Sequence, residues 1–334
     1  MTVFYASFKL LMKGSLRTYF KKIRIEGVEN IPRDRPLLIT PNHQNAFLDA
    51  LIVGAFSPRE LYFLTRSDVF TKWSIPLMKL VNMMPIYRIR DGYSKLSLNE
   101  EVFDRCRQVF DRNKSILIFA EGNHGKEYFL RPLTKGAARL ALQSQMKMEN
   151  ELMIQPVGLN YFDHQSPKST VVVRFGESIS VSKYLEDFQK HEATGLIKMR
   201  DAIANGMRST LILPDETIDY EERRERIFQE ENENMSFHDL KSMNVKDISV
   251  NQKKRKKHLL AKTVNPFPFF LIYKVISKVE DVVFHSSLKF AIALFAFPIW
   301  WSIVFVVVSS TIGINTGLLA VAVMAFGLFY SYQS

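Results

Sequence analysis

The sequence has almost no cysteine, and its C-terminal stretch has no charge. Cys106 is the only cysteine, which excludes disulfide bonds within the chain and fits a reducing compartment. From Phe290 to Ser334 there is no Asp, Glu, Lys, Arg or His. A helix needs about 20 apolar residues to cross the hydrocarbon core of a bilayer. This run therefore predicts a transmembrane hairpin of two short helices around the turn "TIGINTG", rather than a hairpin buried in a soluble core.

The remainder of the chain is basic, with a formal net charge of +11. The block "KKRKKH" (Lys253–His258) lies upstream of the apolar run, and the turn inside that run is uncharged. Because cationic flanks stay on the cytoplasmic side, we expect both ends of the hairpin and the main domain to face the cytoplasm. There is no zinc-finger spacing, no basic-helix zipper and no aromatic-basic RNA-binding strand. Anionic lipid headgroups and an anionic substrate therefore explain the charge better than nucleic acid does.

Residues 1–24 predict an amphipathic helix that lies on the membrane surface. Their apolar positions recur at helical spacing: Phe4, Phe8, Leu11 and Met12. Basic residues occupy other positions of the turn and interrupt any apolar run of the signal-peptide kind: Lys9, Lys13 and Arg17. An ordinary helix packed on the domain fits the same pattern equally well.

Residues 25–181 predict an α/β domain with a mixed sheet covered by helices, because short β-rich runs alternate there with helical patterns. The expected strands are 36–40, 61–65, 84–88, 115–119, 153–159 and 170–176, and the expected helices are 46–56, 73–82, 94–112 and 134–147. Residues 182–264 predict a charged, solvated helical accessory region. Residues 265–289 are aromatic and only partly apolar, which indicates an interfacial segment before the hairpin of 290–334.

The stretch "NHQNAFLD" places a histidine and an aspartate, His43 and Asp49, at the end of an expected strand. Histidine can deprotonate a hydroxyl near neutral pH, and a carboxylate can hold its ring and fix its tautomer. Positions i and i+6 lie about 120° apart on a regular helix. We therefore expect His43 in the loop, Asn45 as the N-cap, and Asp49 reaching back from the first turns.

Two further stretches follow expected strands and carry cations. "MPIYRIRDG" delivers Arg88 and Arg90, and a guanidinium binds phosphate through two parallel hydrogen bonds. One of them binds in this interpretation, while the other pairs with Asp91.

"FAEGNHGKEYFLRPLTKGAARLAL" places Glu121 at the sheet edge, and Gly122 and Gly125 let the backbone pass close to a ligand. Arg131 and Lys135 come next, near the start of a helix whose amide dipoles favour an anion. A fourth stretch, "IQPVGLNY", is a buried strand in which Pro156 suggests an edge or a bulge.

In this order and at these separations, "NHQNAFLD", "PIYR", "FAEG" and "IQPVGL" resemble the motifs of the glycerolipid acyltransferase family, over roughly residues 25–180. "FLRPLTKGAARLAL" and "PVGLNYF" look closest to the glycerol-3-phosphate/dihydroxyacetone-phosphate acyltransferase branch. The resemblance implies acyl transfer from acyl-CoA or acyl-carrier protein to a hydroxyl, with no cofactor and no metal. It also implies membrane lipids and a phosphorylated glycerol-type acceptor as partners, whereas the oligomeric state stays open.

The resemblance implies roles residue by residue. His43 is the general base and Asp49 its partner, and Arg88 binds phosphate. Substrate binding is expected of Glu121, Gly122, Asn123, Arg131 and Lys135. The sequence departs from the family pattern in two places. Five residues instead of four separate His43 from Asp49, and Ala120 and Asn123-His124 replace the common Pro and Thr-Arg or Ser-Arg.

The implied mechanism needs no covalent enzyme intermediate, because His43 takes the proton as the acceptor oxygen attacks the thioester. The Gly-x-Ser-x-Gly elbow of serine hydrolases is absent from the sequence. Three alternatives remain open: a lysophosphatidate acceptor, a lyso-aminolipid acceptor, and a non-catalytic lipid-binding protein on the same scaffold. Neither the acyl chain length nor the donor carrier can be read from these residues.

Overall fold

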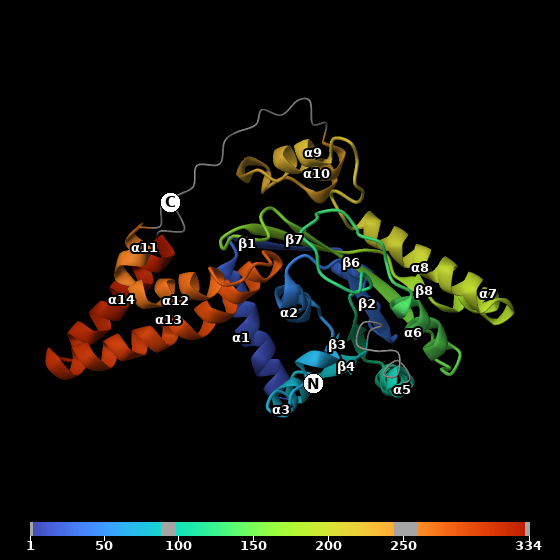
Figure 1. Cartoon of the computed structure of the whole chain (residues 1–334), viewed down its shortest axis with the longest axis horizontal. Helices are drawn as coiled ribbons and strands as arrows, with labels where there is room; N and C mark the ends of the chain where they lie inside the picture. Colours follow the sequence, from blue (N-terminus) through green and yellow to red (C-terminus); the bar gives the residue numbers. More distant parts are fainter. Residues whose placement is uncertain (1–2, 88–97, 244–258, 331–334) are drawn as a thin grey trace.

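The computed structural model describes residues 3–87, 98–243 and 259–330. Its centre is a mixed sheet of eight strands in the order β1-β7-β6-β2-β5-β3-β4, with β8 pairing to β6 (Figure 1). The strands are β1 (Lys22–Glu26), β2 (Leu37–Pro41), β3 (Leu61–Arg66), β4 (Met83–Ile86), β5 (Ser115–Leu117), β6 (Met153–Tyr161), β7 (Thr170–Phe175) and β8 (Ile179–Ser180). Only the pairings of β6 with β7 and β8 are antiparallel among these strands.

Helices cover both faces of the sheet. The α-helices of the described residues are α1 (Val3–Tyr19), α2 (Ala46–Phe56), α3 (Ile75–Leu80), α5 (Leu98–Asp111), α6 (Gly136–Gln145), α7 (Leu185–Lys190), α8 (Glu192–Ser209), α9 (Tyr220–Ile227), α10 (Phe237–Ser242), α11 (Leu259–Val264), α12 (Pro266–Ile276), α13 (Val283–Thr311) and α14 (Ile314–Tyr330). Short 3-10 turns lie at Val28–Asn30, Ser67–Val69, Ser182–Tyr184 and Glu230–Asn232.

Strand β2 shows how the sheet divides the core. Its residues alternate between the two faces, as the pleat of a strand requires. Leu37 and Ile39 pack into one apolar cluster with α1, α2 and Phe290 of α13. Leu38 packs into the other cluster, with residues of α5, α6 and α8. All three side chains are fully buried, so the chain that leaves β2 enters the site from the centre of the molecule.

The six expected strands and the four expected helices are present, which confirms the mixed α/β sheet with helices. Two strands were not predicted, β1 and β8, because β1 carries alternating charges and β8 has two residues. The interpretation of Pro156 as an edge residue is wrong, since β6 lies between β2 and β7. Pro156 falls between the part of β6 that pairs with β8 and the part that pairs with β7. Its missing N–H therefore leaves neither antiparallel ladder incomplete.

Helix α1 packs on the domain through one face. Tyr5, Met12 and Leu16 are buried, and the Tyr5 hydroxyl accepts a hydrogen bond of 3.1 Å from the Leu61 amide. The other face exposes apolar residues, including Leu10 at 72% and Leu11 at 57%. Both sequence interpretations of this helix thus keep support, because one face is core and the other presents apolar side chains outward.

The charged region after residue 181 is less solvated than the sequence suggested. Helix α8 buries Met199, Ile203 and Met207 against the sheet, so it belongs to the main core. Helices α9 and α10 form a smaller apolar cluster with Phe162 and Val172. The basic block Lys253–His258 lies outside the described residues.

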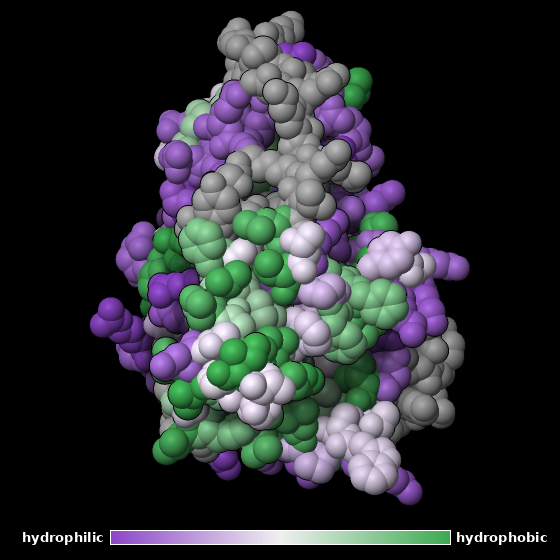
Figure 2. Space-filling model, turned by 90° about the vertical axis from the view of Figure 1, so that its left-hand side faces the viewer, coloured by the Kyte–Doolittle hydropathy of each residue, from purple (hydrophilic) through white to green (hydrophobic). Residues whose placement is uncertain are grey.

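Helices α11 to α14 project from one side of the domain (Figure 1). Within the described residues, α13 alone is long and apolar enough to cross a membrane, with a mean hydropathy of 2.4 over its best window. Only 11% of that window is buried. Exposed Phe295, Ile299 and Ile303 contribute to the apolar surface that Figure 2 shows on this side of the molecule. Helix α14 packs beside α13 but has 17 residues, so the two-span hairpin is not established.

Candidate active site

The loop that leaves β2 is held by the side chain of Asn42. Its Oδ1 accepts from the Leu159 amide at 2.7 Å, and its Nδ2 donates to the Leu159 carbonyl at 3.1 Å. The side-chain amide thus extends the β2–β6 ladder by one position beyond the last backbone pair. This places the next residue, His43, at the carboxyl end of β2, the edge where open α/β sheets build their sites.

His43 and Asp49 meet as the sequence predicted, with His43 in the loop and Asp49 in the first turns of α2. The Nδ1 of His43 lies 2.9 Å from Asp49 Oδ2. The same oxygen accepts from the backbone amides of Gln44 at 2.8 Å and Asn45 at 2.7 Å. Asp49 is fully buried. These three donors fix the carboxylate, so Nδ1 carries the proton and Nε2 is the ring nitrogen that can accept one.

Asn45 occupies the N-cap position of α2, as expected, but its side chain has another role. Its Nδ2 donates to the His164 carbonyl at 2.8 Å, and no capping hydrogen bond from its side chain is found in the described part of the chain. The next residue, Ala46, has a φ of 43° in the left-handed region. The prediction of a conventional Asn cap is therefore wrong in its hydrogen bonding.

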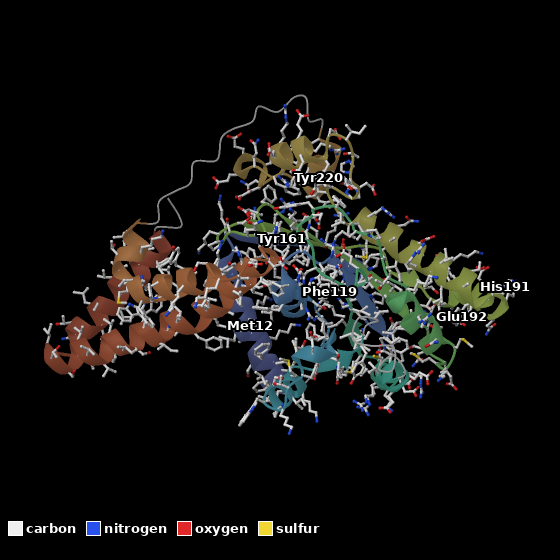
Figure 3. The ribbon with its side chains drawn as sticks, in the orientation of Figure 1. Met12, Phe119, Tyr161, His191, Glu192 and Tyr220 are labelled. Carbon is white, nitrogen blue, oxygen red and sulfur yellow. The ribbon has the colours of Figure 1, made fainter. Side chains whose placement is uncertain are left out.

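Tyr161 is a further hydrogen-bond partner of Asp49, and the sequence analysis did not predict it as a site residue. Its hydroxyl donates to Asp49 Oδ1 at 2.5 Å, from the last residue of β6. Burial, and then the charge of Asp49, raise the pKa of Tyr161 well above its ordinary value, so the hydroxyl stays a donor. Figure 3 places Tyr161 and Phe119 in the centre of the molecule, near α2. The tyrosine in "PVGLNYF" was the available signal.

The backbone of His43 is held by the loop after β5. Its amide donates to Glu121 Oε2 at 2.9 Å, and its carbonyl accepts from the Gly125 amide at 3.0 Å. Arg131 closes the arrangement, with Nη2 at 2.7 Å from Glu121 Oε2 and at 3.3 Å from the His43 carbonyl. The Arg131 amide also donates to Glu121 Oε1 at 3.1 Å. Glu121 therefore holds the histidine loop through Oε2 and the Arg131 backbone through Oε1.

The charge of Glu121 is set by two opposing effects. Burial raises the pKa of its carboxyl, and the charge and hydrogen bonds of Arg131 oppose that rise. The side chain of Glu121 is 2% exposed and that of Arg131 is 16% exposed. The geometry makes this pair a brace for the loop, whereas the sequence analysis expected both residues to contact substrate.

The other expected binding residues lie around this brace. Asn123 is exposed, and its Oδ1 accepts from Arg131 Nη1 at 2.8 Å. Gly122 has a φ of 79°, and a Cβ there would lie 2.9 Å from Thr134 Cγ2. Lys135 is exposed at the N-cap of α6. Arg88 and Arg90 lie outside the described residues.

The ring of His43 is flanked by Phe119 and His124. The Phe119 ring stacks on it with centroids 3.6 Å apart, and the His124 ring meets it edge-on at 5.6 Å. Burial, and then the neighbouring His43, lower the pKa of His124, while Asp281 opposes that shift. His124 Nε2 lies 3.3 Å from Asp281 Oδ2. His124 replaces a common Arg in the family pattern, and its partner comes from the segment just before α13.

A cavity of about 450 Å³ lies beside this histidine. Its lining combines two cations and one carboxylate with polar and apolar residues: Arg66, Asn123, His124, Gly125, Lys126, Asp281, Val282, Val283 and Phe284. Residues from the described ranges 3–87, 98–243 and 259–330 form no cluster of three or more His, Cys, Asp or Glu side chains that could hold a metal ion. His43 does not line this cavity but meets it through the His124 ring. With Arg66 and Lys126 in its lining, the cavity can hold an anionic substrate near a histidine that can accept a proton.

Comparisons with known proteins agree with this geometry. Residues 22–160 match the acyltransferase family. A chloroplastic 1-acyl-sn-glycerol-3-phosphate acyltransferase from Arabidopsis thaliana is 29% identical over 130 residues, which are 37% of this chain and 34% of that protein. Glycerol-3-phosphate O-acyltransferase 1 of Saccharomyces cerevisiae is 30% identical over 115 residues, which are 33% of this chain and 15% of that protein. The chain thus covers about a third and about a seventh of these relatives.

A solved structure was also found. The 1-acyl-sn-glycerophosphate acyltransferase of Thermotoga maritima aligns with a TM-score of 0.44 and 15% identity, over 61% of this chain and 78% of that one. The sequence match contains His43, Asp49 and Glu121, the residues that the fold brings together. Residues 22–160 therefore form an acyltransferase-family domain, which is similar to the domains of two glycerolipid acyltransferases.

Proposed function

We propose that this protein is a membrane-bound O-acyltransferase that moves a fatty acyl group from an acyl thioester to the hydroxyl of a phosphorylated glycerol-type acceptor. The carrying observation is the contact between His43 Nδ1 and Asp49 Oδ2 at 2.9 Å. A histidine held through Nδ1 by a buried carboxylate presents Nε2 as a general base, the group that an alcohol needs to attack a thioester.

In the proposed reaction, Nε2 of His43 accepts the hydroxyl proton while the acceptor oxygen forms a bond to the thioester carbonyl carbon. Asp49 stabilises the imidazolium that results. The tetrahedral intermediate then expels the thiolate as the carbon–sulfur bond breaks, and the imidazolium returns the proton to sulfur. Backbone amides or cationic groups near His43 would stabilise the oxyanion. Lys126, at the rim of the cavity, is a candidate.

The acceptor is a glycerol phosphate in either form of the proposal. The sequence motifs favour glycerol 3-phosphate or dihydroxyacetone phosphate, and a lysophosphatidate acceptor has equal support. One relative is named for each: a glycerol-3-phosphate and a 1-acylglycerol-3-phosphate acyltransferase. Arg88 is the phosphate ligand proposed from sequence. Arg131 is a weaker candidate, because Glu121 engages its guanidinium at 2.7 Å.

The donor is an acyl-CoA or an acyl-carrier protein, and no metal or cofactor is part of the proposal. The apolar surface of α13 supports a membrane location. We propose that α13 and α14 both span, with the catalytic domain on the cytoplasmic side. The basic block Lys253–His258 supports this orientation.

The test is an acceptor panel with purified full-length protein in detergent micelles and a labelled acyl donor. The acceptors are glycerol 3-phosphate, dihydroxyacetone phosphate, lysophosphatidate and a lyso-aminolipid. We expect product with a phosphorylated acceptor, and the largest kcat/KM identifies which one. No transfer to any acceptor from either acyl-CoA or acyl-carrier protein, with folded protein, would reject the proposed function.

A further inference from the structure

The first turn of α2 carries Asp49, yet its local residues do not cap it. The first amides of a helix have no partner within the helix and need an outside acceptor. At this helix the N-cap residue Asn45 points its amide group to the His164 carbonyl at 2.8 Å. Its Oδ1 has no hydrogen-bond partner in the described part of the chain. The next residue, Ala46, has a φ of 43°, a conformation that a side chain disfavours.

Ser287, in the second turn of α13, adds two bonds to this turn, where the Leu48 amide also donates to the Asn45 carbonyl at 3.0 Å. Its hydroxyl donates to the Asn45 carbonyl at 2.6 Å and accepts from the Leu48 amide at 3.1 Å. Leu48 is the third helical residue after the cap position, the place where a capping side chain normally accepts. Ser287 is fully buried, so this hydroxyl has exchanged water for these two partners. A residue some 240 positions away thus acts as the cap of α2.

The hydroxyl lies one residue from the catalytic carboxylate. Asp49 directly follows Leu48, and its Oδ2 accepts from the amides of Gln44 and Asn45 as well as from His43. The Asn45 peptide is therefore held by Asp49 on its amide and by Ser287 on its carbonyl side. Any change in the first turn of α2 therefore moves Asp49, the carboxylate that holds the His43 ring. A displacement of about 1 Å in such a site can cost about 100-fold in rate.

The start of α13 is fixed on the domain by contacts that do not involve α2. The Ser286 hydroxyl lies 2.9 Å from the Tyr19 hydroxyl of α1, and Phe290 packs edge-on against the Tyr19 ring at 5.3 Å. Lys289 Nζ donates to the Gln165 carbonyl at 2.9 Å. With Ser286 at 1% and Ser287 at 0% exposure, two adjacent serines are equally buried and contact different helices.

We propose that Ser287 is a positioning residue of the acyltransferase, and that the membrane helix α13 completes the active site through it. This rests on the proposed function, because the reaction must use His43 and Asp49. Helix α13 does not act only as an anchor. Its first two turns, Val283 to Phe290, lie against α1 and α2, and the remainder forms the apolar surface.

The test compares Ser287→Ala with Ser286→Ala in the full-length protein in detergent micelles. We expect Ser287→Ala to lower kcat about 10-fold or more, with the KM of both substrates within about twofold of wild type, since substrate contacts are unchanged. The acid limb of its pH–rate profile should move to lower pH, because a displaced Asp49 stabilises the imidazolium less. Ser286→Ala should keep the wild-type kcat and the wild-type profile, and thermal unfolding of both variants reports the folded fraction.

Ser287→Thr keeps the hydroxyl and should restore most of kcat, and Ser287→Cys, with a weak donor, should fall between Thr and Ala. If Ser287→Ala does not fold, the Thr and Cys variants decide, and a wild-type kcat in Ser287→Cys overturns the inference. A kcat for Ser287→Ala equal to that of Ser286→Ala overturns it as well. So does a loss that only follows the folded fraction. Failure of the proposed function is a different result, because wild type and Ser286→Ala would then also lack activity.

Discussion

The Tyr161 hydroxyl and His43 Nδ1 bind opposite oxygens of the same buried carboxylate, at 2.5 Å from Asp49 Oδ1 and 2.9 Å from Asp49 Oδ2. The two donors come from β6 and from the loop after β2, which pair as parallel neighbours. Asp49 is therefore held by the centre of the sheet as well as by its own helix. A carboxylate fixed in this way cannot rotate away from the histidine when the ring takes up a proton.

Tyr161→Phe should reduce both stability and turnover. The variant removes a hydrogen bond to a charged, fully buried group, which contributes about 1.5–3 kcal/mol. We expect a loss of this size in the free energy of unfolding and a kcat reduced about 10-fold. Tyr220→Phe is the matched control, because its hydroxyl accepts from the Tyr128 amide at 2.8 Å and does not contact Asp49. Equal kcat values for the two variants, each calculated per folded molecule, would contradict the role given to Tyr161.

Glu121→Gln separates a brace from a substrate ligand. The amide group of Gln would place an N–H donor against the His43 amide, the Arg131 amide or the Arg131 guanidinium, all of which are donors. We expect a fall in the free energy of unfolding of about 1–3 kcal/mol without substrate, together with a lower kcat. Thermal unfolding of the protein without ligand is the measurement. A wild-type unfolding temperature with a raised acceptor KM alone would instead make Glu121 a substrate ligand.

His164 should make the protein sensitive to mild acid. It is 4% exposed, and burial lowers its pKa, with Asp163 and Asp49 opposing. Below the ordinary histidine pKa of about 6.5, the unfolded chain binds a proton that folded His164 does not. The free energy of unfolding therefore decreases as the pH is lowered through this window, by up to about 1.4 kcal/mol per pH unit.

His164→Asn keeps an acceptor near the Tyr128 hydroxyl, which lies 3.1 Å from His164 Nδ1. Its thermal unfolding temperature should change less than that of wild type between about pH 6.5 and 5.5. Parallel curves for the two proteins over that window would show that His164 does not contribute. His124, with a pKa lowered by burial, adds the same trend to both curves.

The transmembrane proposal predicts which positions a membrane-impermeant thiol reagent reaches. In a Cys106→Ala background, a cysteine at Asn315, in the first turn of α14, should react from outside intact cells, and one at Ser334 should not. Cys106 itself is fully buried, and burial raises the pKa of its thiol to about 12. Strong labelling at position 334 from outside would exclude the two-span topology.

The sequence predicted those parts of the site that lie within one motif. His43 and Asp49 are six residues apart, so helix periodicity alone placed one in the loop and the other in the helix. The bonds of Tyr161 and Ser287 to this loop depend on strand order and on where α13 starts. The pairing of Glu121 with Arg131 was missed for a different reason. A glutamate or an arginine can bind a ligand or can pair with another side chain, and only the distances in the structure distinguish these two roles.

The boundary of the predicted membrane segment shows the same limit. Absence of charge placed it at Phe290, whereas α13 begins at Val283. The first two turns are buried by protein instead of lipid, and hydropathy cannot distinguish these two environments. Lys289 lies within the helix because its amine reaches the Gln165 carbonyl.

The most direct test of the proposed mechanism is the rate at which His43→Ala releases thiol from the acyl donor in the presence of the acceptor. His238→Ala is its matched control. His238 is exposed on α10, away from Asp49. Loss of a general base costs about 10²–10⁴-fold. We predict a loss of this size per folded molecule for His43→Ala, together with a lower unfolding temperature because buried Asp49 loses a partner, and wild-type turnover for His238→Ala. Near-wild-type thiol release by folded His43→Ala would contradict the assignment of His43 as the base.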